Sequence, residues 1–432
     1  MPCSRPIDDS PYPILEPKTM QTNLADFIKD TPEGQEADSI LRACVHCGFC
    51  TATCPTYQLL GDELDGPRGR IYLIKQVLEG KKATRHTQLH LDRCLTCRNC
   101  ETTCPSGVQY GRLVDIGRKV VDDQVPRPMM QRLMRSALKE ALPRKWLFSP
   151  AMKMGQLVRP LLPASLKTKV PPAQDAGIWP TTIHARKMLM LDGCVQPAMA
   201  PNINSATARV LDALGVQLLV APRAGCCGAI RHHLNDHDGA KDDMRRNIDA
   251  WWPAIEAGAE AIVMNASGCG AMVKDYAHLL AHDPAYAEKA QRVTALTRDL
   301  SEILPEFEAP LAVQVKARQA GKSVKRVAYH PPCTLQHGQQ IRGKVESVLR
   351  AVGVDVTLCG DSHICCGSAG TYSVLQPELA FKLRDNKLAH LQATKADEIV
   401  SANIGCLTHL QSGTDMPVRH WIELVDNALA AH

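Results

Sequence analysis

The feature of this sequence that most constrains its structure is a run of four cysteines that occurs twice. The first run holds cysteines at 44, 47, 50 and 54, and the second at 94, 97, 100 and 104. A proline follows the last cysteine of each run. Two residues separate the first three cysteines, so three sulfurs can converge on one soft metal centre while a fourth arrives from elsewhere. The spacing therefore indicates metal ligands.

Each run has the ligand pattern of an iron–sulfur cluster, and in two-cluster ferredoxins the fourth cysteine of each run binds the other cluster. The sequence thus predicts two [4Fe–4S] clusters. The predicted ligands are Cys44, Cys47, Cys50 and Cys104 for cluster 1, and Cys94, Cys97, Cys100 and Cys54 for cluster 2. Zinc is the alternative, but zinc sites are usually built from pairs of cysteines and do not require three followed by a fourth and a proline.

The cysteine usage also indicates the compartment. The chain has 18 cysteines in 432 residues, far fewer than a small disulfide-rich domain, and their clustering favours metal binding in a reducing environment. No apolar stretch reaches the length of a membrane span. Residues 1–19 contain five prolines and no signal-peptide core, and we expect them to form a disordered leader. These observations predict a cytoplasmic protein.

Residues 20–125 are expected to form a helical ferredoxin domain. Apolar residues at helical spacing predict helices over 20–29, 71–78 and 113–121. The segment 66–70 reads as a turn before the second of these helices. Its Arg68 and Arg70 would place positive charge near an anionic cluster and raise its potential; the alternative is a pair of solvated turn residues.

Residues 126–180 form a basic, amphipathic connector in this interpretation. Within it, residues 127–170 hold ten Lys or Arg and one acid, for a net charge of +9, whereas the whole chain carries +5. We expect contact with an anionic membrane surface, peripheral on the inner face of the cell membrane, or with an acidic partner. Packing between domains is the alternative. Few aromatic residues interrupt the segment, which argues against nucleic-acid binding.

The remainder is an internal repeat of two units, residues 186–300 and 325–432. Predicted strands alternate with helices in both, which indicates parallel α/β units. Each unit contains four cysteines, two of them adjacent, and each cysteine follows a predicted strand. They are Cys194, Cys226, Cys227 and Cys269 in unit 1, and Cys333, Cys365, Cys366 and Cys406 in unit 2. Open α/β folds bind ligands at this carboxyl edge of the sheet.

The recurrence of these eight cysteines favours metal or redox chemistry over packing, and we expect a third redox site between the units. A further iron–sulfur cluster is predicted in at least one unit. Unit 2 is favoured because His330 and His363 lie nearby in the sequence. The alternative is a thiol–disulfide reductase that uses these cysteines on a substrate disulfide.

The chain from about residue 20 to the end resembles the iron–sulfur subunit of glycolate dehydrogenase (glycolate oxidase). The supporting stretches include RACVHCGFCTATCPTYQLLGDELDGPRGRIYLIKQVLEG and HLDRCLTCRNCETTCPSGVQYGRL, together with the two Cys-Cys-Gly repeats. The resemblance implies partner subunits that bind FAD and oxidise glycolate to glyoxylate. This chain would carry no catalytic residue and would pass electrons towards a membrane acceptor.

The same layout occurs in subunits of lactate and glycerol-3-phosphate dehydrogenases and in part of heterodisulfide reductase, which remain alternatives. One departure from the family pattern concerns a fifth cysteine that often completes a CxxC in each repeat. Ala266 and Asn403 stand at that position here. Each unit therefore keeps four cysteines, enough for one cluster at most.

Overall fold

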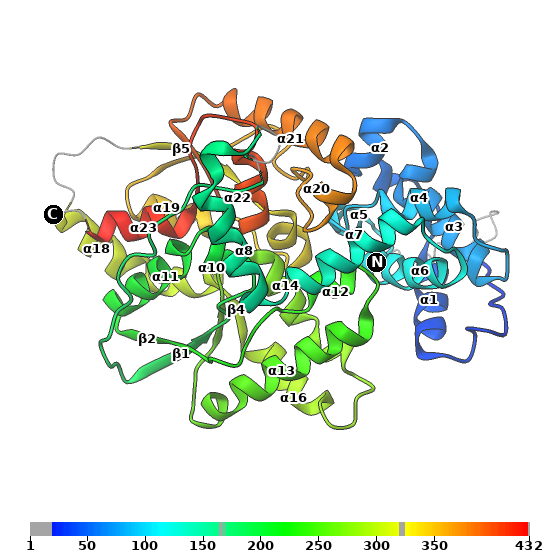
Figure 1. The fold of residues 1–432 in the computed structure, drawn as a ribbon, viewed down its shortest axis with the longest axis horizontal. Coiled ribbons are helices and arrows are strands. Elements are labelled where there is room, and N and C mark those ends of the chain that lie inside the picture. The colour runs from blue at the N-terminus through cyan, green and yellow to red at the C-terminus, as the bar shows by residue number, and fades with distance from the viewer. Residues whose placement is uncertain (1–19, 164–166, 168, 319–324, 431–432) are drawn as a thin grey trace, which may run out of the picture.

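The computed structural model describes residues 20–163, 167, 169–318 and 325–430. The expected leader, residues 1–19, lies outside the described residues. Helical elements near the N-terminus, blue to cyan, gather at one end of the molecule, and two α/β units, green to red, make up the rest (Figure 1). This arrangement confirms the expected class, a helical ferredoxin domain followed by two α/β cysteine-rich units.

The helical part consists of short helices around one apolar core. Its elements are α1 (Pro32–Ala43), η1 (Phe49–Thr51), α2 (Pro55–Leu60), η2 (Glu63–Asp65), α3 (Pro67–Leu78), α4 (Arg85–Asp92), α5 (Asn99–Thr103) and α6 (Tyr110–Gln124). Three of these helices begin at a proline, which suits the first helical position because its missing N–H needs no partner there. Ile74, Leu78 and Leu113 are fully buried in the core between α3 and α6.

Two expectations for this part are wrong. The segment 20–29 is an irregular stretch that passes into a turn at residues 26–30 rather than a helix, and the first helix is α1, where the Thr31 side chain accepts a hydrogen bond from the Gly34 N–H. The expected turn over 66–70 is largely helix, because α3 already begins at Pro67. Gly69 is required in this first turn, since a Cβ there would lie 2.1 Å from the backbone oxygen of Glu63.

The connector forms α7 (Met129–Ala141), α8 (Lys145–Leu157) and η3 (Arg159–Leu161). Helix α7 contacts α12 of unit 1, and α8 contacts α10 of the same unit. Arg127 and Arg135 both form ion pairs with Asp92 of the helical part, at 2.6 and 3.0 Å. The connector therefore packs between the helical part and unit 1 while it links them in the chain.

Unit 1 is built on a parallel sheet with strand order β2-β1-β3-β4. Its strands are β1 (Arg186–Met190), β2 (Val216–Val220), β3 (Ile262–Met264) and β4 (Thr297–Asp299). Its helices are α10 (Gln196–Met199), α11 (Asn202–Ala213), α12 (Ala229–His233), α13 (His237–Glu256), α14 (Ser267–Lys274), α15 (Tyr276–Leu279), α16 (Ala287–Leu296), α17 (Leu300–Ile303), η4 (Leu304–Phe307) and α18 (Glu308–Arg318).

Unit 2 repeats this topology with the order β6-β5-β7-β8. Its strands are β5 (Arg326–His330), β6 (Asp355–Leu358), β7 (Glu398–Ser401) and β8 (Val418–His420). Its helices are η5 (Thr334–Gly338), α19 (Lys344–Ala351), α20 (Tyr372–Leu375), α21 (Pro377–Gln392), α22 (Ile404–Gln411) and α23 (Trp421–Ala430). The edge strands β4 and β8, three residues each, have no expected counterpart in the sequence pattern.

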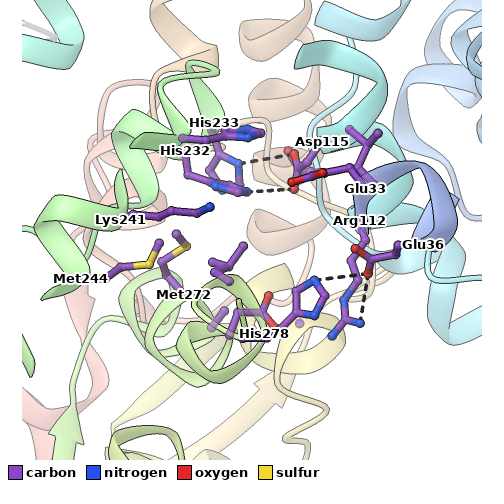
Figure 2. Close-up of a pocket in the computed structure, with 18 of the residues that line it drawn as sticks. Glu33, Glu36, Arg112, Asp115, His232, His233, Lys241, Met244, Met272 and His278 are labelled. Carbon is purple, nitrogen blue, oxygen red and sulfur yellow. Dashed lines mark hydrogen bonds and ion pairs between the residues drawn. The ribbon is translucent and has the colours of Figure 1, made fainter. Parts of the chain in front are cut away.

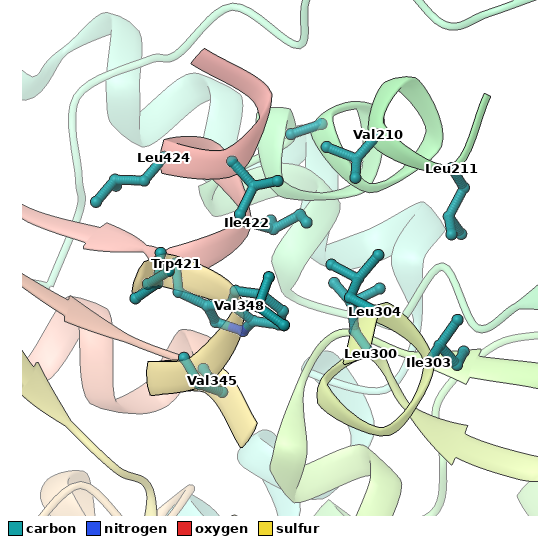
Figure 3. Close-up of a cluster of buried hydrophobic side chains, with 14 of the residues drawn as sticks. Val210, Leu211, Leu300, Ile303, Leu304, Val345, Val348, Trp421, Ile422 and Leu424 are labelled. Carbon is teal, nitrogen blue, oxygen red and sulfur yellow. The ribbon is translucent and has the colours of Figure 1, made fainter. Parts of the chain in front are cut away.

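The two units share one hydrophobic core. Side chains from α11, α17 and η4 of unit 1 pack against side chains from α19 and α23 of unit 2 (Figure 3). Trp421 is almost completely buried there, with Val348 on one side of the interface and Leu304 on the other. Because each unit buries this surface against the other, the two units pack as one block.

Polar contacts fix how the two units are oriented. The buried His420, at the end of β8, donates from Nε2 to the Asn265 carbonyl oxygen of unit 1 at 2.9 Å. Its Nδ1 accepts from the backbone N–H of Ile422 at 3.2 Å. Burial lowers the pKa of His420 to about 3. Both ring nitrogens of the neutral imidazole are thus satisfied, and protonation would put a proton on Nδ1 against the Ile422 N–H.

This histidine should make the contact between the units sensitive to acid. The unfolded chain takes up a proton on His420 near pH 6.5, whereas the folded chain does so only near pH 3, so stability falls as pH decreases between these values. This loss in the free energy of unfolding amounts to at most about 1.4 kcal/mol per pH unit, and we expect His420→Gln to remove it. Urea unfolding at pH 7 and pH 5 measures it. Exposed His282, replaced in the same way, is the control; equal slopes in wild type and His420→Gln would contradict the expectation.

Candidate functional site

The eight cysteines of the two runs surround two adjoining cavities. Four of them, Cys44, Cys47, Cys50 and Cys104, line the first, which we call the Cys44 cavity. The other set, Cys54, Cys94, Cys97 and Cys100, lines the second, the Cys54 cavity. Cys100, Tyr110 and Pro67 line both. Each cavity thus receives three cysteines of one run and the fourth of the other, and the Cys44 cavity is also lined by Cys100.

The backbone of both runs has the same unusual conformation. His46 and Gly48, on either side of the middle cysteine of the first run, have positive φ, and so do Thr96 and Arg98 in the second. For a non-glycine residue this left-handed region costs about 1 kcal/mol, and it persists where surrounding structure enforces it. Here it curls the chain around the cavity, so that three sulfurs separated by two residues point to one side.

The chemistry of these thiols fits an iron–sulfur group. Burial, with the nearby Cys44, Cys104 and Cys47 sulfurs, raises the pKa of Cys50 to about 11. Burial likewise raises the pKa of Cys97 and Cys100 well above the usual value. Thiols that converge but resist ionisation need a positive centre to displace their protons, and iron binds soft thiolates in this way.

The two arginines of the first turn of α3 serve the two cavities separately. Arg68 lines the Cys44 cavity and pairs with Glu63 at 2.7 Å on the half-exposed surface. Arg70 lines the Cys54 cavity and is only 1% exposed. The alternative of solvated turn residues is therefore wrong for Arg70, whose buried charge lies beside the second cysteine set.

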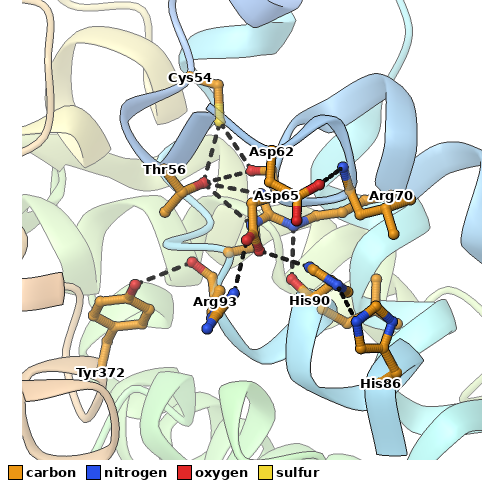
Figure 4. A network of polar contacts seen from close by, with 12 residues as sticks. Cys54, Thr56, Asp62, Asp65, Arg70, His86, His90, Arg93 and Tyr372 are labelled. Atoms are coloured by element: carbon orange, nitrogen blue, oxygen red, sulfur yellow. Dashed lines mark hydrogen bonds and ion pairs between the residues drawn. The ribbon is translucent and has the colours of Figure 1, made fainter. Parts of the chain in front are cut away.

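A buried polar network holds Arg70 in place (Figure 4). Its Nε donates to the His90 carbonyl oxygen at 2.7 Å, and both terminal nitrogens donate to Thr56 Oγ1 at 3.1 Å. The Asp65 carboxylate accepts from Arg70 at 3.4 Å and from Arg93 at 2.8 Å. Thr56 Oγ1 also lies 3.3 Å from Cys54 Sγ, so the network ends at a predicted ligand.

The cysteines of the two α/β units meet in a further cavity, of about 430 Å³, which we call the inter-unit cavity. The cysteines that line it come from both units and from the second run: Cys194, Cys226, Cys227, Cys269, Cys333, Cys365, Cys406 and Cys94. Each unit places its cysteines after β1, β2 and β3, or after β5, β6 and β7, at the carboxyl edge of its sheet. The structure therefore brings both sets together, beside the second run.

The second run contacts the cysteines of unit 2. Cys97 packs against a buried cluster that contains Leu95, Cys333 and Cys365, and Cys333 Sγ lies 3.8 Å from Cys365 Sγ. Cys366 does not line the inter-unit cavity but lies with Cys406 and His330 in a buried group. His363 is outside that group; its carbonyl oxygen accepts hydrogen bonds from Asn99 and His337.

A larger cavity, about 660 Å³, lies between the helical part and unit 1, and sequence reasoning missed it. Figure 2 shows His232 and His233 of α12 opposite Asp115 of α6, with Lys241 of α13 beside them. Burial opposes ionisation of Asp115, but its hydrogen bond with His232 holds the pKa of Asp115 below its usual value. The only sequence signal was the group of histidines at 232, 233 and 237, each of which reads singly as structural.

Two apolar surfaces are exposed near these sites. The first surrounds the exposed Cys47, where Val45 and Phe49 are also exposed. The second, which we call the connector surface, runs along α7, α8 and η3. It consists of Met129, Met130, Leu133, Met134, Trp146, Leu147, Met154, Leu157 and Leu161. The bases Arg132 and Lys153 are exposed on the same helices.

Comparison with family models agrees with this division of the chain. Residues 40–108 match a model described as a 4Fe-4S dicluster domain. Residues 188–274 and 327–411 each match a model described as a cysteine-rich domain. The first match covers both cysteine runs, and the other two cover the cysteines of unit 1 and unit 2.

Similar proteins cover nearly the whole chain. A glycolate oxidase iron–sulfur subunit of Escherichia coli is 55% identical over 411 residues, 95% of this chain and 99% of the relative. A probable glycolate oxidase iron–sulfur subunit of Bacillus subtilis is 30% identical, over 92% of this chain and 93% of the relative. Lactate utilization protein A of Geobacillus thermodenitrificans is 27% identical, over 56% of this chain and 99% of the relative.

Replacement of Arg70 should separate the two cysteine sets experimentally. We expect Arg70→Gln to lower the reduction potential of the group held in the Cys54 cavity, because a buried positive charge favours the added electron. It should also destabilise the chain by about 3–5 kcal/mol, since Asp65 loses a buried partner. Redox titration followed by EPR measures the potential. Arg68→Gln, at the half-exposed position, is the control and should have a smaller effect; equal shifts would contradict the assignment.

Proposed function

The chain belongs to the family of glycolate oxidase iron–sulfur subunits, and on this premise we propose that it carries electrons away from a flavin-binding partner that oxidises glycolate to glyoxylate. Two [4Fe–4S] clusters, bound by the ligand sets given above, would accept and release single electrons. The observation that supports this role is the continuous series of cysteine sets, from the exposed Cys47 to the inter-unit cavity. Substrate chemistry is assigned to the partner, and no catalytic residue to this chain.

The residues of the chain have three tasks in this role. The cysteines hold the two groups at adjoining cavities, because Cys100 lines both. Tyr110, almost fully buried, covers both cavities, and its hydroxyl donates to Cys94 Sγ at 3.6 Å. Arg70 supplies the buried positive charge. Together they exclude water and set the charge around each group.

We assign a further metal–sulfur centre to unit 2, with Cys333, Cys365, Cys366 and Cys406 as its candidate ligands. Cys97 packs beside Cys333 and Cys365, so this set continues the series that begins at the first run. A hydrogen bond to a neighbouring thiol and burial raise the pKa of Cys333 well above its usual value. Such a set of buried thiols is again suited to a metal that displaces the thiol protons.

The exposed apolar residues around Cys47 are the proposed docking site of the flavin-binding partner. Val45 and Phe49 flank the one cysteine of the two runs that is exposed. Exposed aromatic side chains of this kind are typical anchors of protein interfaces. A partner bound there would bring its flavin to the Cys44 cavity.

The test uses this chain co-expressed with its partner subunits and purified without oxygen. We expect glycolate to bleach the visible absorption of the iron–sulfur groups, and lactate or glycerol 3-phosphate to do so much more slowly. Phe49→Asp should slow bleaching about tenfold or more, because loss of an interface anchor weakens docking. Stopped-flow absorption measures the rate.

Phe27→Asp is the matched control, since Phe27 is 52% exposed and Phe49 60% exposed in the same helical part. Dithionite should reduce both variants like the wild type. Two results would contradict the proposed function. One is glycolate oxidation by the isolated chain, and the other is a chain that contains zinc and negligible iron.

We further propose that the connector surface attaches the complex to an anionic membrane, at the inner face of the cell membrane. None of the described helices is both long and apolar enough to cross a bilayer. Exposed Met, Leu and Trp side chains beside lysine and arginine are typical of helices that lie in the membrane interface. Each base near an anionic surface contributes about 1 kcal/mol, and salt screens this attraction.

Flotation with lipid vesicles tests the attachment. We expect the complex to float with vesicles that contain phosphatidylglycerol, less at high salt, and little with pure phosphatidylcholine. Met130→Glu should reduce flotation severalfold. Val313→Glu is the matched control, because Met130 and Val313 are both 70% exposed and Val313 lies on α18. A complex that stays with the soluble fraction at low salt would contradict the proposal.

A further inference from the structure

One buried histidine in unit 2 has no hydrogen-bond partner. His330 ends β5 and is 1% exposed, and neither of its ring nitrogens has a partner among the described residues. Its backbone is fixed, because Ser401 Oγ donates to the His330 carbonyl oxygen at 2.8 Å. Buried polar groups are nearly always satisfied, so a side chain with two unpaired nitrogens indicates a ligand that the chain itself does not supply.

The neighbours of His330 are two buried thiols. A nitrogen of His330 and the sulfurs of Cys366 and Cys406 all lie within 4.8 Å of one another. The three residues come from the end of β5, the loop after β6 and the first turn of α22, all at the carboxyl edge of the sheet. Asn403 Nδ2 lies 3.7 Å from Cys406 Sγ, as a donor that would support a thiolate.

The spacing of these donors suits a single metal ion. In a tetrahedral site with metal–sulfur bonds near 2.3 Å and metal–nitrogen bonds near 2.0 Å, neighbouring ligand atoms lie about 3.5–3.8 Å apart. Donors already within 4.8 Å reach that spacing through small side-chain rotations. Imidazole and thiolate are the usual mixed ligands of zinc and of iron.

Unit 1 lacks this arrangement. Leu191 stands three residues before Cys194, just as His330 stands three residues before Cys333. Leu191 is buried and packs with Met264 and Cys227 in an apolar cluster. The duplicated units therefore differ at the one position that would bring a nitrogen donor to the adjacent cysteines.

We propose that His330 is a nitrogen ligand to the metal centre of unit 2 and shares one transition-metal ion with Cys366 and Cys406. This inference rests on the further centre assigned above to unit 2, and it adds a nitrogen ligand to the cysteines of that centre. The ion is zinc, or iron as a single ion or as one corner of a cluster. The sulfurs and the imidazole bind it with loss of the thiol protons to solvent. Unit 1, with Leu191, does not form an equivalent site.

The test compares wild type with His330→Leu, which gives unit 2 the side chain found in unit 1. The full-length chain is purified without oxygen, and its iron, zinc and sulfide are measured together with the EPR signals of the two runs. We expect His330→Leu to lose the metal of unit 2 and to keep the signals of the runs. Where the metal is iron, nitrogen coupling in pulsed EPR of protein with 15N-labelled histidine should disappear in the variant. Where it is zinc, Co²⁺ added to the apo chain should give a thiolate absorption band that the variant lacks.

His409→Leu is the matched control, because His409 is also buried in unit 2 but its Nε2 bonds the Ala380 carbonyl oxygen. This control should retain the metal. A further variant at this position, His330→Cys, keeps a donor atom and should retain the metal with an altered spectrum. It therefore tests the inference even if His330→Leu fails to fold.

The outcomes separate this inference from the proposed function. His330→Leu could retain all the metal that the wild type holds beyond the two runs, with equal or higher thermal stability. That result would show that His330 is only a packing residue. Wild type with no metal beyond the two runs would overturn both this inference and the centre of unit 2. Electron transfer through the two runs would stand in either case, since glycolate-dependent bleaching tests it separately.

Discussion

The arrangement of this molecule depends on how the second cysteine run docks onto both α/β units. Inside that run, Arg98 pairs with Asp275 of unit 1, Asn99 donates to the His363 carbonyl oxygen of unit 2, and Thr102 bonds His337 of unit 2. The backbone on either side of Cys97 is strained, and these contacts hold it in that conformation. They also fix Cys97 beside the cysteines of unit 2, so the helical part and the repeat form one series of sites.

The sequence predicts those features that depend on short spacing and repetition. The cysteine runs, the parallel α/β units and the position of each repeat cysteine after a strand follow from local pattern, and the α/β units are confirmed. Features that depend on distant contacts are not predictable in this way. The segment 20–29 has helical periodicity, yet it forms an irregular stretch and a turn, and the Ala25 N–H bonds the Leu78 carbonyl oxygen at the end of α3. The strands β4 and β8 are too short to produce an alternating pattern.

The basic connector illustrates why net charge alone is ambiguous. Several of its bases are engaged inside the molecule: Arg127 and Arg135 pair with Asp92, and Lys145 pairs with Asp192. The same segment also exposes apolar side chains, and Arg132 and Lys153 are exposed on the same helices. Packing between domains therefore accounts for Arg127, Arg135 and Lys145, while contact with a surface stays a proposal for the exposed residues of the same segment.

The first turn of α3 explains how one short motif can give the two cysteine sets different properties. Successive residues of a helix are rotated by about 100°, so Arg68 and Arg70 point in nearly opposite directions. Pro67 lines both cavities, which shows that this turn passes between them. The Arg68 side chain is half-exposed, so water screens its charge, whereas the Arg70 side chain is buried, where a charge acts more strongly. We therefore expect a higher potential at the inner set, so that electrons that enter near the exposed Cys47 would move towards the repeat cysteines.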